Sequence, residues 1–163
     1  MIFALVLFTS EEVLCQSFTS ERERGTIGIG YQVSYPFHGF SVIIHPDLPF
    51  SFQGMVGIIG NYESYCTKIR YHFGKSMTYS YGLIGALTEE MTDYDIDGNS
   101  QTKYKTTFGY GIGFGVEYSY SKIPIWMDLE VGYGFLNSKS SSFKNRAIIL
   151  GFGFHYYFPV SGF

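Results

Sequence analysis

A two-residue alternation of side-chain character runs through most of this chain. Its clearest stretch covers residues 108–118. Six alternate positions there are large and apolar, namely Phe108, Tyr110, Ile112, Phe114, Val116 and Tyr118. The positions between them are Gly109, Gly111, Gly113, Gly115 and Glu117. A helix would scatter both sets around its circumference, whereas a strand sends successive side chains to opposite faces. The stretch is therefore predicted to be a strand with one apolar face.

The same period recurs along the chain and predicts eight strands. They cover residues 27–35, 40–45, 50–60, 65–73, 77–87, 108–118, 126–135 and 147–158. Most of them are near the roughly 9–11 residues that a tilted membrane strand needs. The pattern predicts an all-β chain, folded as a closed up-and-down antiparallel barrel.

Composition favours a barrel whose apolar face points outward. Aromatic residues make up 20% of the chain and charged residues only 15%, against roughly 25% charged residues in a typical soluble domain. A soluble barrel of the lipocalin type, the main alternative, would cover its outside with Lys and Glu. Here the non-apolar face is mostly Gly, Ser and Thr, which suit a narrow lumen. No apolar run is long enough for a membrane helix, so embedding in lipid would require a closed β-barrel.

The lengths of the connections predict an orientation. Residues 74–76 and 121–122 form tight connections, whereas 88–103 and 137–145 are long. The connections at 36–39 and 61–64 are short as well. Bacterial barrels have short periplasmic turns and longer extracellular loops, so the barrel is expected to start and end in the periplasm.

The predicted domain organisation has one barrel with short flanking segments. Residues 1–16 resemble a secretory signal peptide, although no Lys or Arg precedes the apolar run, which leaves a truncated start as an alternative. Residues 17–24 are expected to form a polar periplasmic lead-in, 25–158 the barrel, and 159–163 a C-terminal tail.

The final predicted strand resembles the C-terminal strand of bacterial outer-membrane proteins. Its alternating apolar residues are Phe152, Phe154, Tyr156 and Phe158. Residues 25–158 as a whole are similar in pattern to the small eight-stranded class of the OmpA transmembrane domain and OmpX. This resemblance implies a Gram-negative outer membrane and contact with its lipids and lipopolysaccharide. It also implies insertion by the barrel-assembly machinery, and a barrel that stands alone as a monomer. Together with Phe108, Tyr110, Ile112 and Phe114, the four C-terminal residues are predicted to face lipid.

Seven charged or titratable residues are predicted to point into the lumen. Strand parity selects Lys68, Arg70, His72, Glu117, Asp128, Glu130 and His155, most of them toward the periplasmic half. Unpaired charges in a narrow, dry lumen are costly, so opposite signs are expected to pair and form an ion-pair plug. Above this plug the glycine-rich walls are expected to leave room for water. A narrow channel, or a barrel that binds a small ligand or ion, is the alternative.

One stretch of the longest connection resembles the first half of a calcium-binding loop. Asp93, Asp95 and Asp97 alternate and are followed by Gly98, as in D-x-D-x-D-G. The twelfth position, which should supply a bidentate Glu, is Tyr104. Calcium binding is therefore one alternative, beside a solvated acidic loop and divalent bridging to lipopolysaccharide phosphates. No other cofactor is expected.

The sequence favours a non-enzymatic structural or surface-interaction role. No Lys/Arg cluster offers a footprint for nucleic acid. Two eight-stranded barrels are lipid A enzymes, an acyl hydrolase and an acyltransferase, and the hydrolase carries a His-x-Ser pair that is absent here. His38 with Ser41 and Glu63 is the remaining combination for an enzyme of that kind. The assignment of Gly113 to the lumen face and Phe114 to the lipid face also predicts that an Arg substitution is tolerated better at Gly113 than at Phe114.

Overall fold

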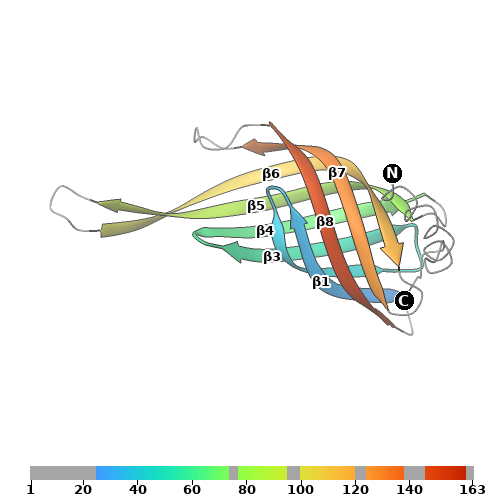
Figure 1. Ribbon diagram of the computed structural model, residues 1–163. Coiled ribbons are helices and arrows are strands. Elements are labelled where there is room, and N and C mark those ends of the chain that lie inside the picture. Colours follow the sequence, from blue (N-terminus) through green and yellow to red (C-terminus); the bar gives the residue numbers. More distant parts are fainter. Residues whose placement is uncertain (1–24, 74–76, 95–99, 120–123, 138–145, 161–163) are drawn as a thin grey trace, which may run out of the picture.

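The computed structural model describes residues 25–73, 77–94, 100–119, 124–137 and 146–160. Its strands are β1 (Thr26–Ser34), β2 (His38–His45), β3 (Phe50–Ile59), β4 (Tyr62–His72), β5 (Thr78–Tyr94), β6 (Ser100–Ser119), β7 (Ile125–Asn137) and β8 (Arg146–Pro159). Each strand pairs with the next and β8 pairs with β1, which closes the sheet into a barrel (Figure 1). The predicted fold class is therefore confirmed. Among the described residues, no helix is long and apolar enough to cross a membrane.

The seam between β1 and β8 is a full ladder. Its antiparallel register runs from Thr26 opposite Pro159 to Ser34 opposite Gly151. The backbone N–H of Val160 also donates to the carbonyl of Gly25 at 2.8 Å. Both ends of the described barrel thus lie at one end of the molecule, which we call the terminal end. The opposite end, where β5 joins β6, is the hairpin end. The predicted segments 1–16 and 17–24 lie outside the described residues, as do residues 161–163 of the tail.

The alternation separates an exposed outer face from a packed lumen. On the outer face of β6, the side chain of Ile112 is 72% exposed and that of Phe114 is 63% exposed. The intervening glycines lie under large side chains of adjacent strands. A Cβ atom at Gly115 would lie 2.3 Å from the ring of Tyr79, and one at Gly113 would lie 2.6 Å from that of Tyr81. Glycine on one strand thus makes room for an aromatic ring on the next.

The expectation of water-filled space toward the hairpin end was wrong. That part of the lumen holds a cluster of buried residues, which we call the apolar plug: Phe37, Met55, Cys66, Leu83, Leu87, Leu136 and Ile149. Small side chains predict open walls, but their missing volume is taken up by large neighbours. A side chain at Gly113 would likewise overlap the ring of Tyr81, so an Arg there would also carry a packing cost. That Arg is tolerated better at Gly113 than at Phe114 stays a prediction.

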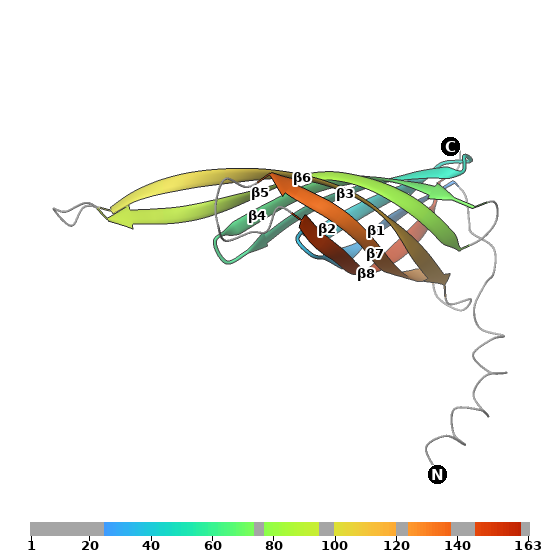
Figure 2. The same ribbon diagram turned by 90° about the horizontal axis from the view of Figure 1, so that it is seen from above.

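The predicted loop at 88–103 is mostly strand. β5 and β6 stay paired, with Thr88 opposite Thr106, Thr92 opposite Thr102, and Tyr94 opposite Ser100. They form a hairpin that extends well beyond the other strands in both ribbon views (Figures 1 and 2). The polar composition suggested a loop, but alternating Thr, Tyr and Lys residues are also compatible with a solvated ribbon. Residues 95–99 lie outside the described part.

Replacing an inward glycine should disrupt this packing. We expect Gly115→Val to lower the free energy of unfolding by about 1–3 kcal/mol, because the new side chain overlaps the buried ring of Tyr79. Gly82→Val is the matched control, since Gly82 is exposed and a Cβ there meets nothing within 4 Å. Urea unfolding of the detergent-folded variants measures both values. Equal losses for the two variants would contradict the packing scheme.

Candidate functional site

All seven residues predicted for the lumen lie inside the barrel and are buried. β4 supplies Lys68, Arg70 and His72, which share a face because side chains of a strand repeat every two residues. The others come from the opposite wall, with Glu117 on β6, Asp128 and Glu130 on β7, and His155 on β8. The bore is narrow enough for side chains from the two walls to meet. We call this set the lumen network.

Glu130 is the centre of the lumen network. Its carboxylate forms salt bridges with Lys68 and with Nη2 of Arg70, the latter at 3.2 Å. The hydroxyl of Tyr79 donates to the same carboxylate at 3.0 Å. Its two cross-strand neighbours are glycines, Gly115 and Gly151. No neighbouring side chain therefore blocks the carboxylate on its own wall.

Polar side chains of β1 complete the shell of this carboxylate. Gln32 donates from Nε2 to Glu130 at 3.3 Å and to Asp128 at 3.0 Å. The hydroxyl of Ser34 donates to Glu130 at 3.2 Å. Glu130 therefore connects β7 with β1, β4 and β5. A buried carboxylate needs several such donors to offset its lost hydration.

Arg70 binds the remaining carboxylates. Its Nη1 lies 2.8 Å from Oε1 of Glu117, and its Nη2 lies 3.6 Å from Oδ2 of Asp128. Nη2 also donates to the amide oxygen of Gln53 at 2.7 Å. The guanidinium carbon lies 4.6 Å from the centre of the Tyr79 ring, which adds a cation–π contact.

The lumen network closes the bore at its level. The side chains of Lys68, Arg70 and His72 are 0% exposed, and that of Glu117 is 1% exposed. Water therefore has almost no access to these side chains from either end. Toward the hairpin end the apolar plug lies on top of this layer. Phe37 belongs to that plug although it comes from the turn between β1 and β2, and its ring lies over Gly85 and Gly109.

Two chains of Ser, His and acid extend from the lumen network. Nε2 of His155 lies 3.0 Å from the hydroxyl of Ser41, while its Nδ1 lies 3.4 Å from Asp128. In the second chain, Nε2 of His72 lies 2.9 Å from the hydroxyl of Ser51. Its Nδ1 lies 3.9 Å from Glu117. This order of groups is that of a nucleophile, a base and an orienting acid.

Burial argues against catalysis by either chain. Ser41 is 1% exposed and Ser51 is 0% exposed, so no substrate carbonyl can approach their hydroxyls. Ser41 also accepts a hydrogen bond from Gln53 at 2.7 Å. The two serine hydroxyls instead give Nε2 of each buried imidazole a hydrogen-bond partner.

The enzyme alternative considered from the sequence does not assemble. Ser41 faces the lumen and bonds to His155 rather than to His38. Glu63 accepts a hydrogen bond from Tyr65 at 3.1 Å on the exposed side of β4. The three residues His38, Ser41 and Glu63 therefore form no common site.

Sequence reasoning did not assign several polar members of this site to the lumen. They are Gln32, Ser34, Ser41, Ser51, Gln53 and Tyr79. Each occupies an inward position of a predicted strand, so the same parity that selected the charged residues could have found them. Attention to formal charge alone left them out.

The acidic stretch of the hairpin gives no described metal site. Asp93 lies in β5, and its Oδ2 accepts a bond from Nζ of Lys103 at 2.7 Å. Asp95 and Asp97 lie outside the described residues. Within the part that the structure describes, no group of three or more His, Cys, Asp or Glu residues is arranged to hold a metal ion. Calcium binding stays a prediction.

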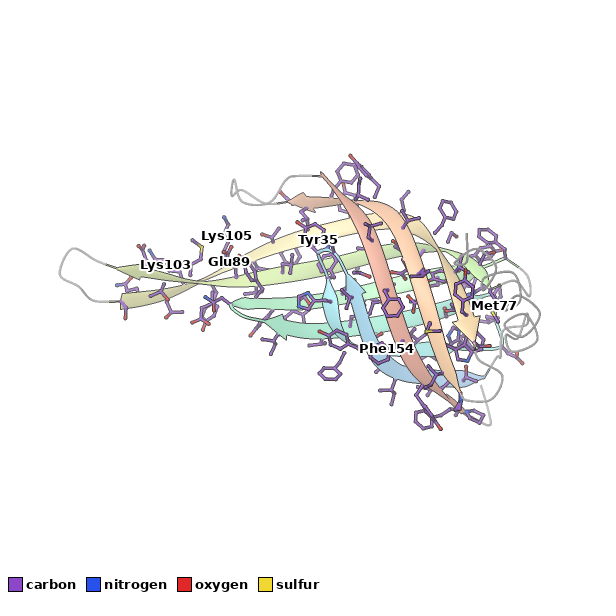
Figure 3. All side chains as sticks on the ribbon, viewed as in Figure 1. Tyr35, Met77, Glu89, Lys103, Lys105 and Phe154 are labelled. Carbon is purple, nitrogen blue, oxygen red and sulfur yellow. The ribbon has the colours of Figure 1, made fainter. Side chains whose placement is uncertain are left out.

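The eight residues predicted to face lipid all lie on the outside of the barrel. Their exposed fractions range from 45% for Phe152 to 72% for Ile112. Figure 3 shows Phe154 on the wall, away from the labelled Glu89, Lys103 and Lys105 of the projecting hairpin. These outer residues belong to an apolar surface that continues around all of the strands.

Comparison with solved structures supports the fold. The chain is similar to the crystal structure of the N-terminal β-barrel domain of Pseudomonas aeruginosa OprF, with a TM-score of 0.51 and 12% sequence identity. The match covers 84% of this chain and all of the OprF domain. At this identity the likeness concerns the fold alone. No protein-family model matches the chain, and neither does a curated protein.

Removing the central carboxylate should destabilise the barrel strongly. We expect Glu130→Gln to lower the free energy of unfolding by about 3–5 kcal/mol, because the buried charge of Lys68 loses its partner. Asp93→Asn breaks an ion pair whose side chains are 61% and 64% exposed, and should cost about 1 kcal/mol or less. Urea titration followed by tryptophan fluorescence measures both. A loss at Glu130 no larger than that at Asp93 would refute the central role.

Removing the aromatic ring of Phe37, in the turn between β1 and β2, should leave a cavity in the apolar plug. Phe37→Ala is expected to lower the free energy of unfolding by about 3–5 kcal/mol, since the ring is 2% exposed. Tyr35→Ala in the same turn is the control, because Tyr35 is 57% exposed. The same urea titration applies. If both variants behaved alike, Phe37 would not be part of the plug.

Proposed function

We propose that this protein is a bacterial outer-membrane β-barrel with a non-enzymatic role, either structural or in interactions at the cell surface. Its wall would span the bilayer, its lumen would stay closed, and its long hairpin would extend outward. The fold and the distribution of side chains support this proposal.

The observation that carries it is the reversal of the usual burial pattern. Large apolar side chains are exposed on every strand, whereas Lys68, Arg70 and Glu130 are inside and dry. An apolar surface of this extent is rare on soluble proteins and typical of surfaces that meet lipid. A closed barrel also leaves no strand edge in the hydrocarbon, where an unpaired backbone group would be costly.

The orientation follows from the two ends of the barrel. The connections at the terminal end, 46–49, 73–77 and 120–124, are all short, whereas the projecting hairpin and the longest connection, 138–145, leave the hairpin end. Short turns are usual on the periplasmic side and longer projections on the outer side. The β5–β6 hairpin would then stand on the outer side of the membrane. The signal-like start and the aromatic C-terminal strand are consistent with export and with insertion by the barrel-assembly machinery. Outer-membrane lipids and lipopolysaccharide would surround a monomeric barrel.

A narrow channel is the first alternative. Two stacked layers oppose it, because the lumen network and the apolar plug each fill the bore. Conductance of liposomes that carry the protein would separate the two functions. Steady single-channel currents from folded barrels would favour the channel.

A lipid A acyl hydrolase or acyltransferase is the second alternative. Lipid A chemistry needs reactive groups on a surface that lipid can reach, and the serine–histidine pairs found here are buried. Mass spectra of lipid A from cells with and without the protein would test it. A change of one acyl chain that depends on the protein would overturn the non-enzymatic proposal.

Two equally exposed positions on one strand test the membrane location. Ile112 is 72% exposed in the barrel wall, and Tyr104 is 69% exposed on the projecting hairpin. In lipid vesicles, Ile112→Arg should cost about 2–4 kcal/mol of folding free energy, as expected for a lipid-facing Arg near the bilayer midplane. Tyr104→Arg should be nearly neutral, because its site would lie in water.

Folding of both variants is read from heat-modifiable gel migration and urea titration in vesicles. A barrel that is soluble in water would tolerate both substitutions alike. That result, or a wild-type protein that shows no heat-modifiable shift in lipid, would refute the membrane location.

A further inference from the structure

A layer of aromatic side chains fills the bore at the terminal end. Trp126 lies at the start of β7, Tyr157 near the end of β8, and His45 at the end of β2. These residues are 5%, 4% and 2% exposed, respectively. The ring centre of Tyr157 lies 5.2 Å from that of Trp126 and 5.1 Å from that of His45. The three rings therefore form a continuous row, with Tyr157 in the middle.

Tyr157 and His45 are also joined by a hydrogen bond. The phenolic oxygen of Tyr157 lies 3.0 Å from Nε2 of His45. When the imidazole proton is on Nδ1, Nε2 accepts this bond and the phenol donates it. A Cβ atom at Gly28 would lie 2.7 Å from the Tyr157 ring, so the missing side chain there makes room for the ring. The phenol is thus held in a packed site with a base in line to take its proton.

Tyr79 and Tyr81, which also face the lumen, have different surroundings. The guanidinium carbon of Arg70 lies 4.6 Å from the ring centre of Tyr79, and Nζ of Lys68 lies 5.2 Å from that of Tyr81. A cation over a ring is attracted by the electrons of that ring and opposes the removal of one of them. Of these three tyrosines, Tyr157 is therefore the one where oxidation is favoured.

We propose that Tyr157 and His45 form a redox-active pair, which takes one oxidising equivalent from Trp126 and holds it as a neutral tyrosyl radical. The oxidant is a one-electron oxidant of the oxygen-radical class that reaches the terminal end of the barrel. Trp126 is the entry point because an indole loses an electron more readily than a phenol that still carries its proton. The proposal concerns the interior of the barrel and does not depend on the membrane location.

The transfer has two balanced steps. The oxidant first takes one electron from the indole of Trp126, which becomes a radical cation. One electron then moves from Tyr157 to this radical cation, while the phenolic proton of Tyr157 moves to Nε2 of His45. The products are a neutral indole, a neutral phenoxyl radical and an imidazolium ion. A phenol that loses an electron becomes strongly acidic, so the second step requires a proton acceptor within hydrogen-bond distance.

Burial makes the radical persistent. Two exposed phenoxyl radicals couple when they meet, whereas Tyr157 is 4% exposed inside a closed barrel. The pair would therefore store the oxidising equivalent away from the exposed tyrosines of the outer face, such as Tyr156.

The test generates the radical at one known place. Trp126 is the single tryptophan of the chain, so an ultraviolet laser flash at a wavelength that tyrosine does not absorb ionises only this residue. The sample is the full-length, detergent-folded protein, with folding verified by heat-modifiable gel migration. Transient absorption should show the indole radical decaying and the phenoxyl radical appearing at the same rate. This rate should fall in heavy water, because a proton moves with the electron.

Substitutions identify the acceptor of the electron and the acceptor of the proton. Tyr157→Phe should abolish the fast appearance of the phenoxyl radical. Tyr156→Phe is the matched control, because Tyr156 is the preceding residue, 46% exposed on the outer face, and its loss should change nothing. His45→Gln keeps a hydrogen-bond acceptor that takes up no proton. It should slow the appearance by about a hundredfold, as expected when a positioned proton acceptor is lost.

Several results would overturn this proposal. The wild-type result alone decides the main point, because a folded protein whose indole radical decays without a phenoxyl radical has no such relay. An unchanged phenoxyl signal in Tyr157→Phe, or its loss in Tyr156→Phe, would place the radical elsewhere. A wild-type rate in His45→Gln would show that His45 takes no proton. Each of these results leaves the proposed membrane role untouched, since that role is tested by folding in lipid.

Discussion

The narrow bore of an eight-stranded barrel is the constraint on which the rest of this structure depends. Inward side chains from opposite walls reach one another, so every large or charged group needs space or a partner. Glycines meet this need beside Tyr79 and Tyr81, and ion pairs meet it around Glu130. The two solutions are linked. Gly115 makes room for the ring of Tyr79, and the hydroxyl of that ring then donates to Glu130.

The sequence was sufficient to predict the fold because the alternation is independent of partner strands. Side chains such as Ile112 and Phe114 must leave the sheet on one face, and Glu117 on the other, whatever the register. Closure followed from the composition, since an apolar outer face needs a barrel without edges. The length of the hairpin was missed because most of its residues from Thr88 to Thr106 are polar, on both faces. A solvated ribbon and a loop have similar compositions.

The candidate site was predictable in membership but not in arrangement. Parity selects Lys68, Arg70 and Glu130 for the lumen. It cannot choose which carboxylate meets both cations, because that depends on register and on glycines across the sheet. The position of Phe37 inside the barrel could not be predicted for another reason. It lies in a turn, where no period applies, and its position in the bore comes from the space over Gly85 and Gly109.

The contacts of Glu130 join strands that are not neighbours in the sheet. Glu130 connects β7 across the bore to β4 and to β1. Separation of any one of these strands from the barrel would therefore break contacts that also hold the others in place. An incomplete sheet that lacks β1 or β4 would leave the carboxylate of Glu130 without the donors of Gln32 and Ser34, or without Lys68 and Arg70. Half-formed barrels should therefore be scarce, and closure of the seam and assembly of the interior should happen as a single event.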